Sequence, residues 1–172
     1  MSERVPAPGD LALIEALVNT LDIESGADEL DTEDGRARFG LTAHQVPPAR
    51  ELRESLRAAL LAHAGHPPHR ETTPLGELLA HAPLLVTVDA HDGAAHLTPA
   101  DGEPLLSRVA VAVAGSLVAG TWPRLKACEA PTCHWAYYDR SPAGRGRWCS
   151  MAVCGARAKM RTYRARQAGE TA

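Results

Sequence analysis

Apolar side chains recur at helical spacing in four stretches of the chain, and each stretch predicts a helix. The first follows Asp10, a residue type that caps helix N-termini, and the second opens with the pair Pro47–Pro48. The face of the second helix opposite its leucines is charged. A short third helix is expected after Pro74 and a fourth after Pro104. Their apolar positions are Leu11, Ile14, Leu17 and Val18; Leu52, Leu56, Ala59, Leu60 and His63; Leu75, Leu78 and Leu79; and Leu105, Leu106, Val109, Val111, Val113, Leu117 and Val118.

The fourth helical stretch is apolar on nearly all sides, so we expect it to be buried at the centre of its domain. Before it, residues 84–90 and 94–100 carry alternating β-forming residues on either side of Asp92-Gly93, a strong hairpin signal. Residues 23–40 are polar, acidic and contain glycine, which predicts a loop. The acids of this loop do not follow the spacing of a calcium-binding loop.

Basic and acidic residues are separated along the chain. Residues 121–172 hold ten Lys and Arg against three acids, a net charge of +7, whereas residues 1–120 carry −10. A separation this sharp predicts two parts with different partners. We therefore expect an N-terminal domain over residues 1–120 and a small module over residues 121–172 that polyanions attract.

All four cysteines lie in the basic module, in the pattern Cys128-x4-Cys133-x15-Cys149-x4-Cys154. Two close pairs separated by a loop are typical of a tetrahedral four-thiolate zinc site. Because four protein ligands leave no position for water or substrate, we expect one structural zinc ion. Two alternatives stay open, namely two disulfides, or a site in which His134 replaces one ligand. The expected fold class is α+β: a mainly helical N-terminal domain with a β-hairpin, then a four-cysteine zinc-finger module ending in a helix.

The final helix is expected directly after Cys154 and is strongly basic. Arg157, Arg161 and Arg164 share one face of it, and Lys159 and Arg166 lie on another. Such a run usually meets solvent, but like charges four residues apart cost stability, so their presence favours a polyanionic partner. Arg140, Arg145 and Arg147 on the central loop add to the basic surface, while Met160 and Tyr163 are expected to face the core of the module. The module's aromatic residues are expected in its core rather than stacked on bases: Trp135, Tyr137, Tyr138 and Trp148.

The segment RLKACEAPTCHWAYYDRSPAGRGRWCSMAVCGARAKMRTYRAR resembles a CGNR-type zinc finger, over about residues 122–166. The motif that gives the family its name appears as Cys154–Arg157, with Ala156 in place of the Asn. This change affects any role of the Asn side chain and leaves the cysteines intact. LALIEALVNTLD at residues 11–22 resembles the opening motif of the ABATE domain, and Leu75–Pro83 resembles a shorter motif of the same domain.

The resemblance implies a bacterial stress-response transcription regulator of a kind found mainly in actinobacteria and related soil bacteria. We expect the finger to bind DNA phosphates and the N-terminal domain to sense a small-molecule effector or to form a homodimer. Asn19 and Thr20 belong to the opening motif and are candidates to line a ligand pocket, or simply to cap a helix. The residues expected to contact nucleic acid are Arg145, Arg147, Arg157, Lys159, Arg161, Arg164 and Arg166.

Two other functions fit the same residues. The finger could bind RNA or a protein instead of DNA, or its thiolates could act as a redox switch because Arg and Lys nearby favour reactive sulfur. An enzyme is not expected, since the chain has no phosphate loop, no nucleophile elbow and no telling carboxylate pair. We interpret the histidine-rich stretch as a solvated loop interrupted by prolines rather than as a metal site; its histidines are His63, His66, His69 and His81. No apolar run is long enough to span a membrane and the start does not resemble a signal peptide, so we expect a cytoplasmic protein without a membrane partner.

Overall fold

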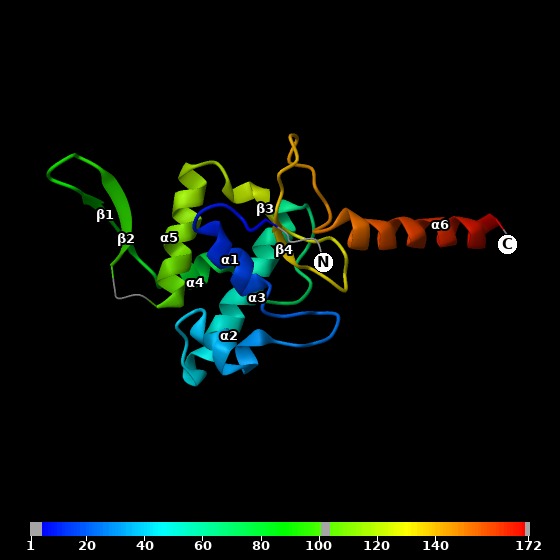
Figure 1. Cartoon of the computed structure of the whole chain (residues 1–172), viewed down its shortest axis with the longest axis horizontal. Helices are drawn as coiled ribbons and strands as arrows, with labels where there is room; N and C mark the ends of the chain where they lie inside the picture. The colour runs from blue at the N-terminus through cyan, green and yellow to red at the C-terminus, as the bar shows by residue number, and fades with distance from the viewer. Residues whose placement is uncertain (1–4, 101–103, 171–172) are drawn as a thin grey trace.

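Three helices form the body of the protein: α1 (Leu11–Val18), α3 (Val46–His63) and α5 (Leu105–Val118). The computed structural model describes residues 5–100 and 104–170, with side chains through residue 167 (Figure 1). α1 packs against both longer helices, and its Ile14 and Leu17 are fully buried. Leu56 of α3 and Val109 of α5 complete the centre of this core. The helical spacing of apolar residues therefore predicted the body correctly.

Helix α3 begins as its two prolines suggest, because Pro47 and Pro48 occupy the first turn, where a missing N–H is not needed. Much of the charged face of α3 is buried. Arg53, Glu54 and Arg57 are each at most 3% exposed. Segments from both ends of the chain cover this face and supply the partners that make the burial of three charges tolerable.

The acidic segment at residues 23–40 is more ordered than expected. It contains the 3-10 turn η1 (Glu29–Asp31) and the short helix α2 (Glu33–Ala37). The side chains of Asp28 and Thr32 accept hydrogen bonds from the backbone N–H groups of Leu30 and Gly35, so each side chain caps the turn that follows it. Leu30 is fully buried and anchors the segment.

After the short helix α4 (Leu75–Leu79), the chain forms a β-hairpin of β1 (Leu84–Val88) and β2 (Ala95–Pro99). The strands are antiparallel, with Val86 opposite Leu97, and the connection contains Asp92-Gly93 as predicted. The hairpin stands at one end of the molecule, beside α5 (Figure 1).

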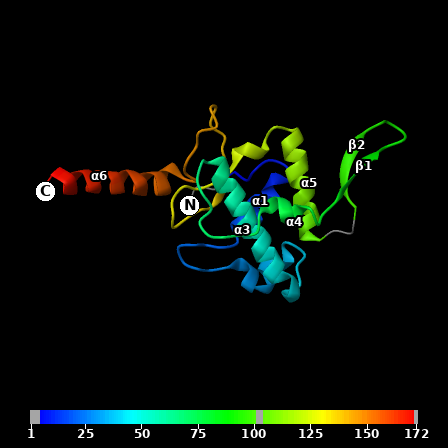
Figure 2. The ribbon, with the colours of Figure 1, turned by 180° about the vertical axis from the view of Figure 1, so that it is seen from behind.

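Helix α5 is not buried on all sides as expected. Leu105, Val109 and Val113 face the core, but Leu117 and Val118 are 58% and 87% exposed. α5 lies between α1 and the hairpin, so its residues from Leu105 to Ala114 are buried or half-buried, and exposure is confined to its last turn (Figures 1 and 2).

The chain then enters the 3-10 turn η3 (Trp122–Arg124) and the antiparallel pair β3 (Leu125–Ala127) and β4 (Ala136–Tyr138). β3 packs against α3 and β4 against α1. Leu125, Ala127 and Ala136 are fully buried in the same core as the helices. The helical body and the start of the cysteine segment therefore share one core.

A single π-helical turn, η4 (Met151–Gly155), leads into α6 (Ala156–Glu170). α6 projects from the end of the molecule opposite the hairpin and lies apart from the other elements in both views (Figures 1 and 2). No helix in the described parts of the chain is long and apolar enough to cross a membrane.

Candidate metal centre

The four cysteines converge at the junction between the helical body and α6. Cys128 follows β3, Cys133 lies in the turn before β4, Cys149 lies two residues before η4, and Cys154 lies within η4. Their Sγ atoms all lie within 4.8 Å of one another. The Sγ–Sγ distances are 3.6 Å for Cys133–Cys149 and 3.8 Å for Cys149–Cys154. A tetrahedral Zn²⁺ with 2.3 Å Zn–S bonds sets its ligands about 3.8 Å apart, so the cluster fits zinc.

All four cysteines carry free thiols, so the alternative of two disulfides does not describe this arrangement. Hydrogen bonds from Cys133 and Cys149 hold the pKa of Cys128 well below its ordinary value. The side-chain hydrogen bond with Cys128 raises the pKa of Cys149 to about 12, and burial raises the pKa of Cys154. Four thiolates this close together repel one another, and a bound cation such as zinc would offset that repulsion.

His134 does not belong to the cluster. Its Nδ1 lies 2.9 Å from the carbonyl oxygen of Cys128, and its ring packs against His69. The residue has a positive φ of 47°, which is unusual for a side chain other than glycine. This backbone conformation closes the turn around Cys133 through a hydrogen bond from the His134 N–H to Ala130.

Arg57 connects this turn to the body from inside the protein. Its guanidinium is fully buried and donates to the carbonyl oxygens of His134 and Val18, both at 2.8 Å, and to the Glu54 carboxylate at 3.0 Å. Burial alone would raise the pKa of Glu54, but Arg57 and Arg53 outweigh it and hold the pKa below its ordinary value. The ion pair is therefore charged, and it fixes the cysteine turn against α1 and α3.

Asn19 and Thr20, the candidates for a ligand pocket, make hydrogen bonds within the fold. Asn19 is the C-terminal cap residue of α1, and its side-chain amide bonds to the backbone of Ala136 in β4. Thr20 is buried, donates to the carbonyl of Leu17 and accepts from Arg53. Their side chains hold the cysteine segment and α3 in place, and a role in ligand binding stays a prediction.

A second ion pair shapes the central loop between β4 and Cys149. Lys126 Nζ lies 2.9 Å from the Asp139 carboxylate, and both side chains are buried. Burial alone would raise the pKa of Asp139, but hydrogen bonds from Ser141, Lys126 and Gly146 hold it well below its usual range. A Cβ at Gly146 would stand 2.8 Å from the carboxylate oxygen, so this close approach requires glycine. The pair fixes the loop that carries Arg145 and Arg147.

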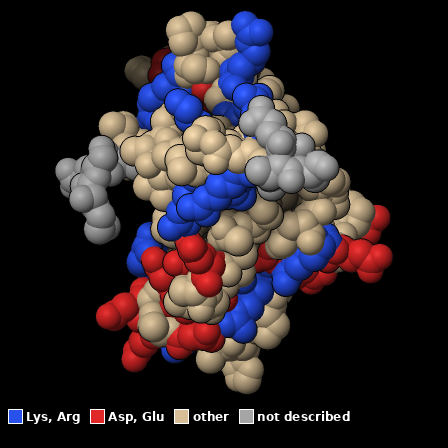
Figure 3. Space-filling view, turned by 90° about the vertical axis from the view of Figure 1, so that its right-hand side faces the viewer, with Lys and Arg blue, Asp and Glu red and all other residues tan. Residues whose placement is uncertain are grey.

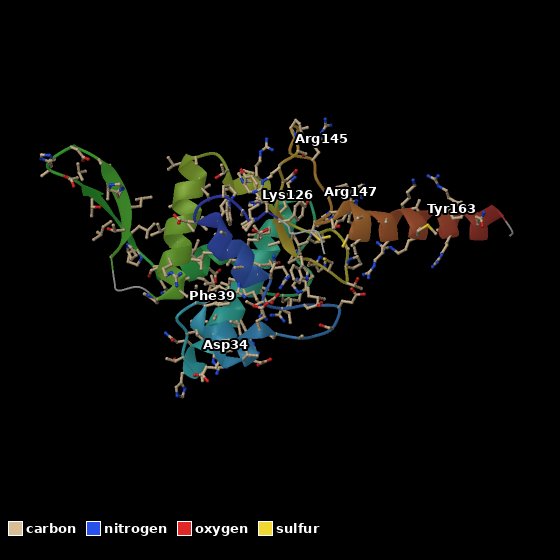
Figure 4. All side chains as sticks on the ribbon, in the orientation of Figure 1. Asp34, Phe39, Lys126, Arg145, Arg147 and Tyr163 are labelled. Atoms are coloured by element: carbon tan, nitrogen blue, oxygen red, sulfur yellow. The ribbon has the colours of Figure 1, made fainter. Side chains whose placement is uncertain are left out.

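Two of the arginines expected to contact nucleic acid are paired with acids. Arg147 bonds to both carboxylate oxygens of Glu129 and stacks on Trp148, 5.3 Å from the ring centroid. Arg157 reaches Glu24 in the loop after α1, at 2.9 Å. Arg145 is exposed on the central loop (Figure 4).

The other four expected residues project from α6 into solvent and have no ion pair in the described part of the chain: Lys159, Arg161, Arg164 and Arg166. Arg157, Arg161 and Arg164 line one shallow groove with Met160, as the helical spacing predicted. Viewed from the α6 end, most Asp and Glu lie in the lower half of the surface, whereas Lys and Arg are spread over the top, the middle and positions beside the acids (Figure 3).

The aromatic residues of the module are mostly structural. Tyr137 is buried and donates to the carbonyl of Gly146 at 2.7 Å, and Trp148 packs against the cysteine cluster. The expectation that Met160 and Tyr163 face the module's core is wrong, because they are 49% and 55% exposed on the projecting helix.

Residues 124–167 match the family model described as the CGNR zinc finger. No curated protein matches the chain. The match covers all four cysteines and α6 through residue 167, and the cysteine geometry fits a tetrahedral ion. Together they show that this part of the chain is a zinc-binding module.

Proposed function

We propose that the chain is a non-enzymatic, zinc-dependent transcriptional regulator whose finger binds duplex DNA. The observation that carries the proposal is α6, which leaves the zinc site as a free helix bearing four cations without an ion pair to the described residues. In this proposal the helical body senses a small-molecule effector or holds two copies together. The likeness of residues 11–22 to the ABATE opening motif supports that regulatory role.

The dimensions of α6 suit a DNA groove. Its 15 residues span about 22 Å at 1.5 Å per residue. An α-helix with side chains is roughly 10–12 Å across, which matches a major groove about 12 Å wide. The zinc ligand Cys154 stands two residues before Ala156, the first residue of α6, so the metal would fix the direction of the helix.

The cations would divide between the two walls of the groove. Arg161 and Arg164 share one face of α6, and Lys159 and Arg166 lie on another, so phosphates of both strands are within the reach of one helix. Met160 and Tyr163 are exposed between these charges and offer apolar contact to base edges. Arg147 and Arg157 contribute less because their acids compete with phosphate.

Fluorescence anisotropy of the zinc-loaded full chain on labelled duplex DNA, titrated at several salt concentrations, tests the proposal. Phosphate contacts release counterions, so affinity should fall steeply with salt. Arg161→Ala and Arg164→Ala should each weaken binding and reduce the salt slope by about one. Arg38→Ala, an exposed arginine of the body that pairs with Glu29, is the matched control and should change neither.

Absent binding, or an affinity that ignores salt, would refute the proposal. Single-stranded RNA and an acidic protein are tested as competitors in the same assay. Preferential displacement of the duplex by either one would replace DNA with that partner.

A further inference from the structure

The hairpin β1–β2 carries an apolar face that the helical body covers only in part. The register places Leu84, Val86 and Val88 opposite Pro99, Leu97 and Ala95, so one face of the hairpin is wholly apolar. Val86 and Val88 on this face are 71% and 64% exposed. Neither strand contains Lys, Arg, Asp or Glu, the residues that proteins use to protect a free sheet edge.

The two edges of the hairpin differ. β2 makes most of the hairpin's contact with α5 and lies between α5 and β1 (Figure 1). Its outer edge also carries Pro99, which has no N–H to donate. The outer edge of β1 contains no proline and faces away from the body. A further strand can therefore pair with β1 and not with β2.

The hydrogen bonds at the ends of the hairpin show which β1 groups are directed outward. Asp89 N–H donates to Ala94 at 2.8 Å, and Ala100 N–H donates to Pro83 at 3.0 Å. In an antiparallel ladder, directly opposite residues alternate between hydrogen-bonded and non-hydrogen-bonded pairs. Residues 85 and 87 therefore also form backbone hydrogen bonds with β2. The N–H and C=O groups of Leu84, Val86 and Val88 then face outward, where they bond to no other described element of the chain.

We propose that β1 pairs in antiparallel fashion with β1 of a second copy of this chain, forming a four-stranded sheet. A register centred on Val86 sets Val86 against the partner's Val86 and Leu84 against the partner's Val88. Every residue in these pairs is one with outward backbone groups, so the edge is complementary to itself, as a two-fold interface requires. The same register joins the two apolar faces and brings no like charges together. An isolated two-stranded hairpin is marginal in water, and the added strands stabilise it.

This surface gives a location to the dimerisation included in the proposed function. It is tested without nucleic acid, so failure of dimerisation and failure of DNA binding are separate results. Analytical ultracentrifugation of the zinc-loaded full chain should give twice the mass of one chain. Val86→Pro removes an outward N–H and no hairpin hydrogen bond, so this variant should sediment as a monomer with unchanged zinc content and circular dichroism. Val118→Ala, which changes an exposed valine away from the hairpin, is the control and should stay dimeric.

Amide hydrogen exchange gives a second readout that does not depend on a variant. Protection of the amides of Leu84, Val86 and Val88 should rise with protein concentration, because only pairing between copies covers them. A wild-type chain that sediments as a monomer throughout the concentration range would overturn the proposal. A dimer that persists in Val86→Pro, with exchange at these amides independent of concentration, would place the interface elsewhere.

Discussion

The side-chain amide of Asn19 pairs with the backbone of Ala136, 117 positions away, as a strand would. Asn19 Nδ2 donates to the Ala136 carbonyl at 3.0 Å, and the Ala136 N–H donates to Asn19 Oδ1 at 2.7 Å. These bonds satisfy the outer edge of β4 with the last turn of α1. Asn19 therefore links the helical body to β4, the strand that follows Cys128 and Cys133 in the chain.

Replacing Asn19 should destabilise the whole chain. Asn19→Ala leaves the N–H and carbonyl of Ala136 without their partner, at about 0.5–1.5 kcal/mol per bond, so we expect a loss of roughly 1–3 kcal/mol in the free energy of unfolding. Urea denaturation of the zinc-loaded protein measures it. Asn19→Asp keeps the acceptor and should lose less than Asn19→Ala. A wild-type free energy of unfolding in Asn19→Ala would contradict the coupling.

Zinc removal should lower the stability of the helical body as well as the finger. Metal analysis should find about one zinc per chain, lost in Cys128→Ser and in Cys149→Ser. Because β3 packs into the core beside α3, a chelator should lower the melting temperature followed by the circular dichroism of the helices. Ser150→Ala, beside a ligand but outside the cluster, is the control and should retain the metal. Unchanged melting after complete zinc removal would show that the two parts are energetically independent.

Freeing a paired arginine should strengthen DNA binding. Glu24→Gln releases Arg157 from a weak, exposed ion pair, so affinity should rise, by at most about fivefold, and the salt slope should steepen. Glu33→Gln removes an acid from α2 and keeps Arg157 paired. Equal gains in the two variants would mean that net charge, rather than the Glu24–Arg157 pair, limits binding.

The Lys126–Asp139 pair should make stability depend on pH. Asp139→Asn leaves Lys126 buried without its carboxylate and should cost about 3–5 kcal/mol near neutral pH. The pKa of Asp139 is lowered in the folded state, so its contribution is complete above the unfolded value of about 3.9 and is lost as the pH falls below it. The difference between the two proteins in urea denaturation should therefore shrink from pH 5 to pH 3. A difference that stays constant would exclude a charged Asp139.

Local signals in the sequence predicted much of this structure. The pair Pro47–Pro48 starts α3, Asp92-Gly93 turns the hairpin, and the cysteine spacing brings four thiols together. Each of these features is decided by neighbours in sequence or by the chemistry of one residue type. The burial of Arg57 was not predictable in this way, because its backbone partners Val18 and His134 lie 39 and 77 positions away.

The surface of α6 shows a second limit of sequence reasoning. The spacing of Met160 and Tyr163 correctly places them on the helix, but it carries no information about what the helix packs against. The charge separation likewise predicted a basic module and missed that Glu129 and Glu24 neutralise two of its arginines. Contacts between segments that are remote in sequence decide both what α6 packs against and which arginines are paired with acids.

The hairpin and α6 lie at opposite ends of the molecule (Figure 1). A dimer formed through β1 would therefore carry its two fingers at its far poles, facing away from each other. Such an assembly is poorly suited to neighbouring half-sites on one turn of duplex. It would instead hold two separate stretches of DNA, so its occupancy would follow looping and compaction of the chromosome rather than the base-pair spacing of an operator.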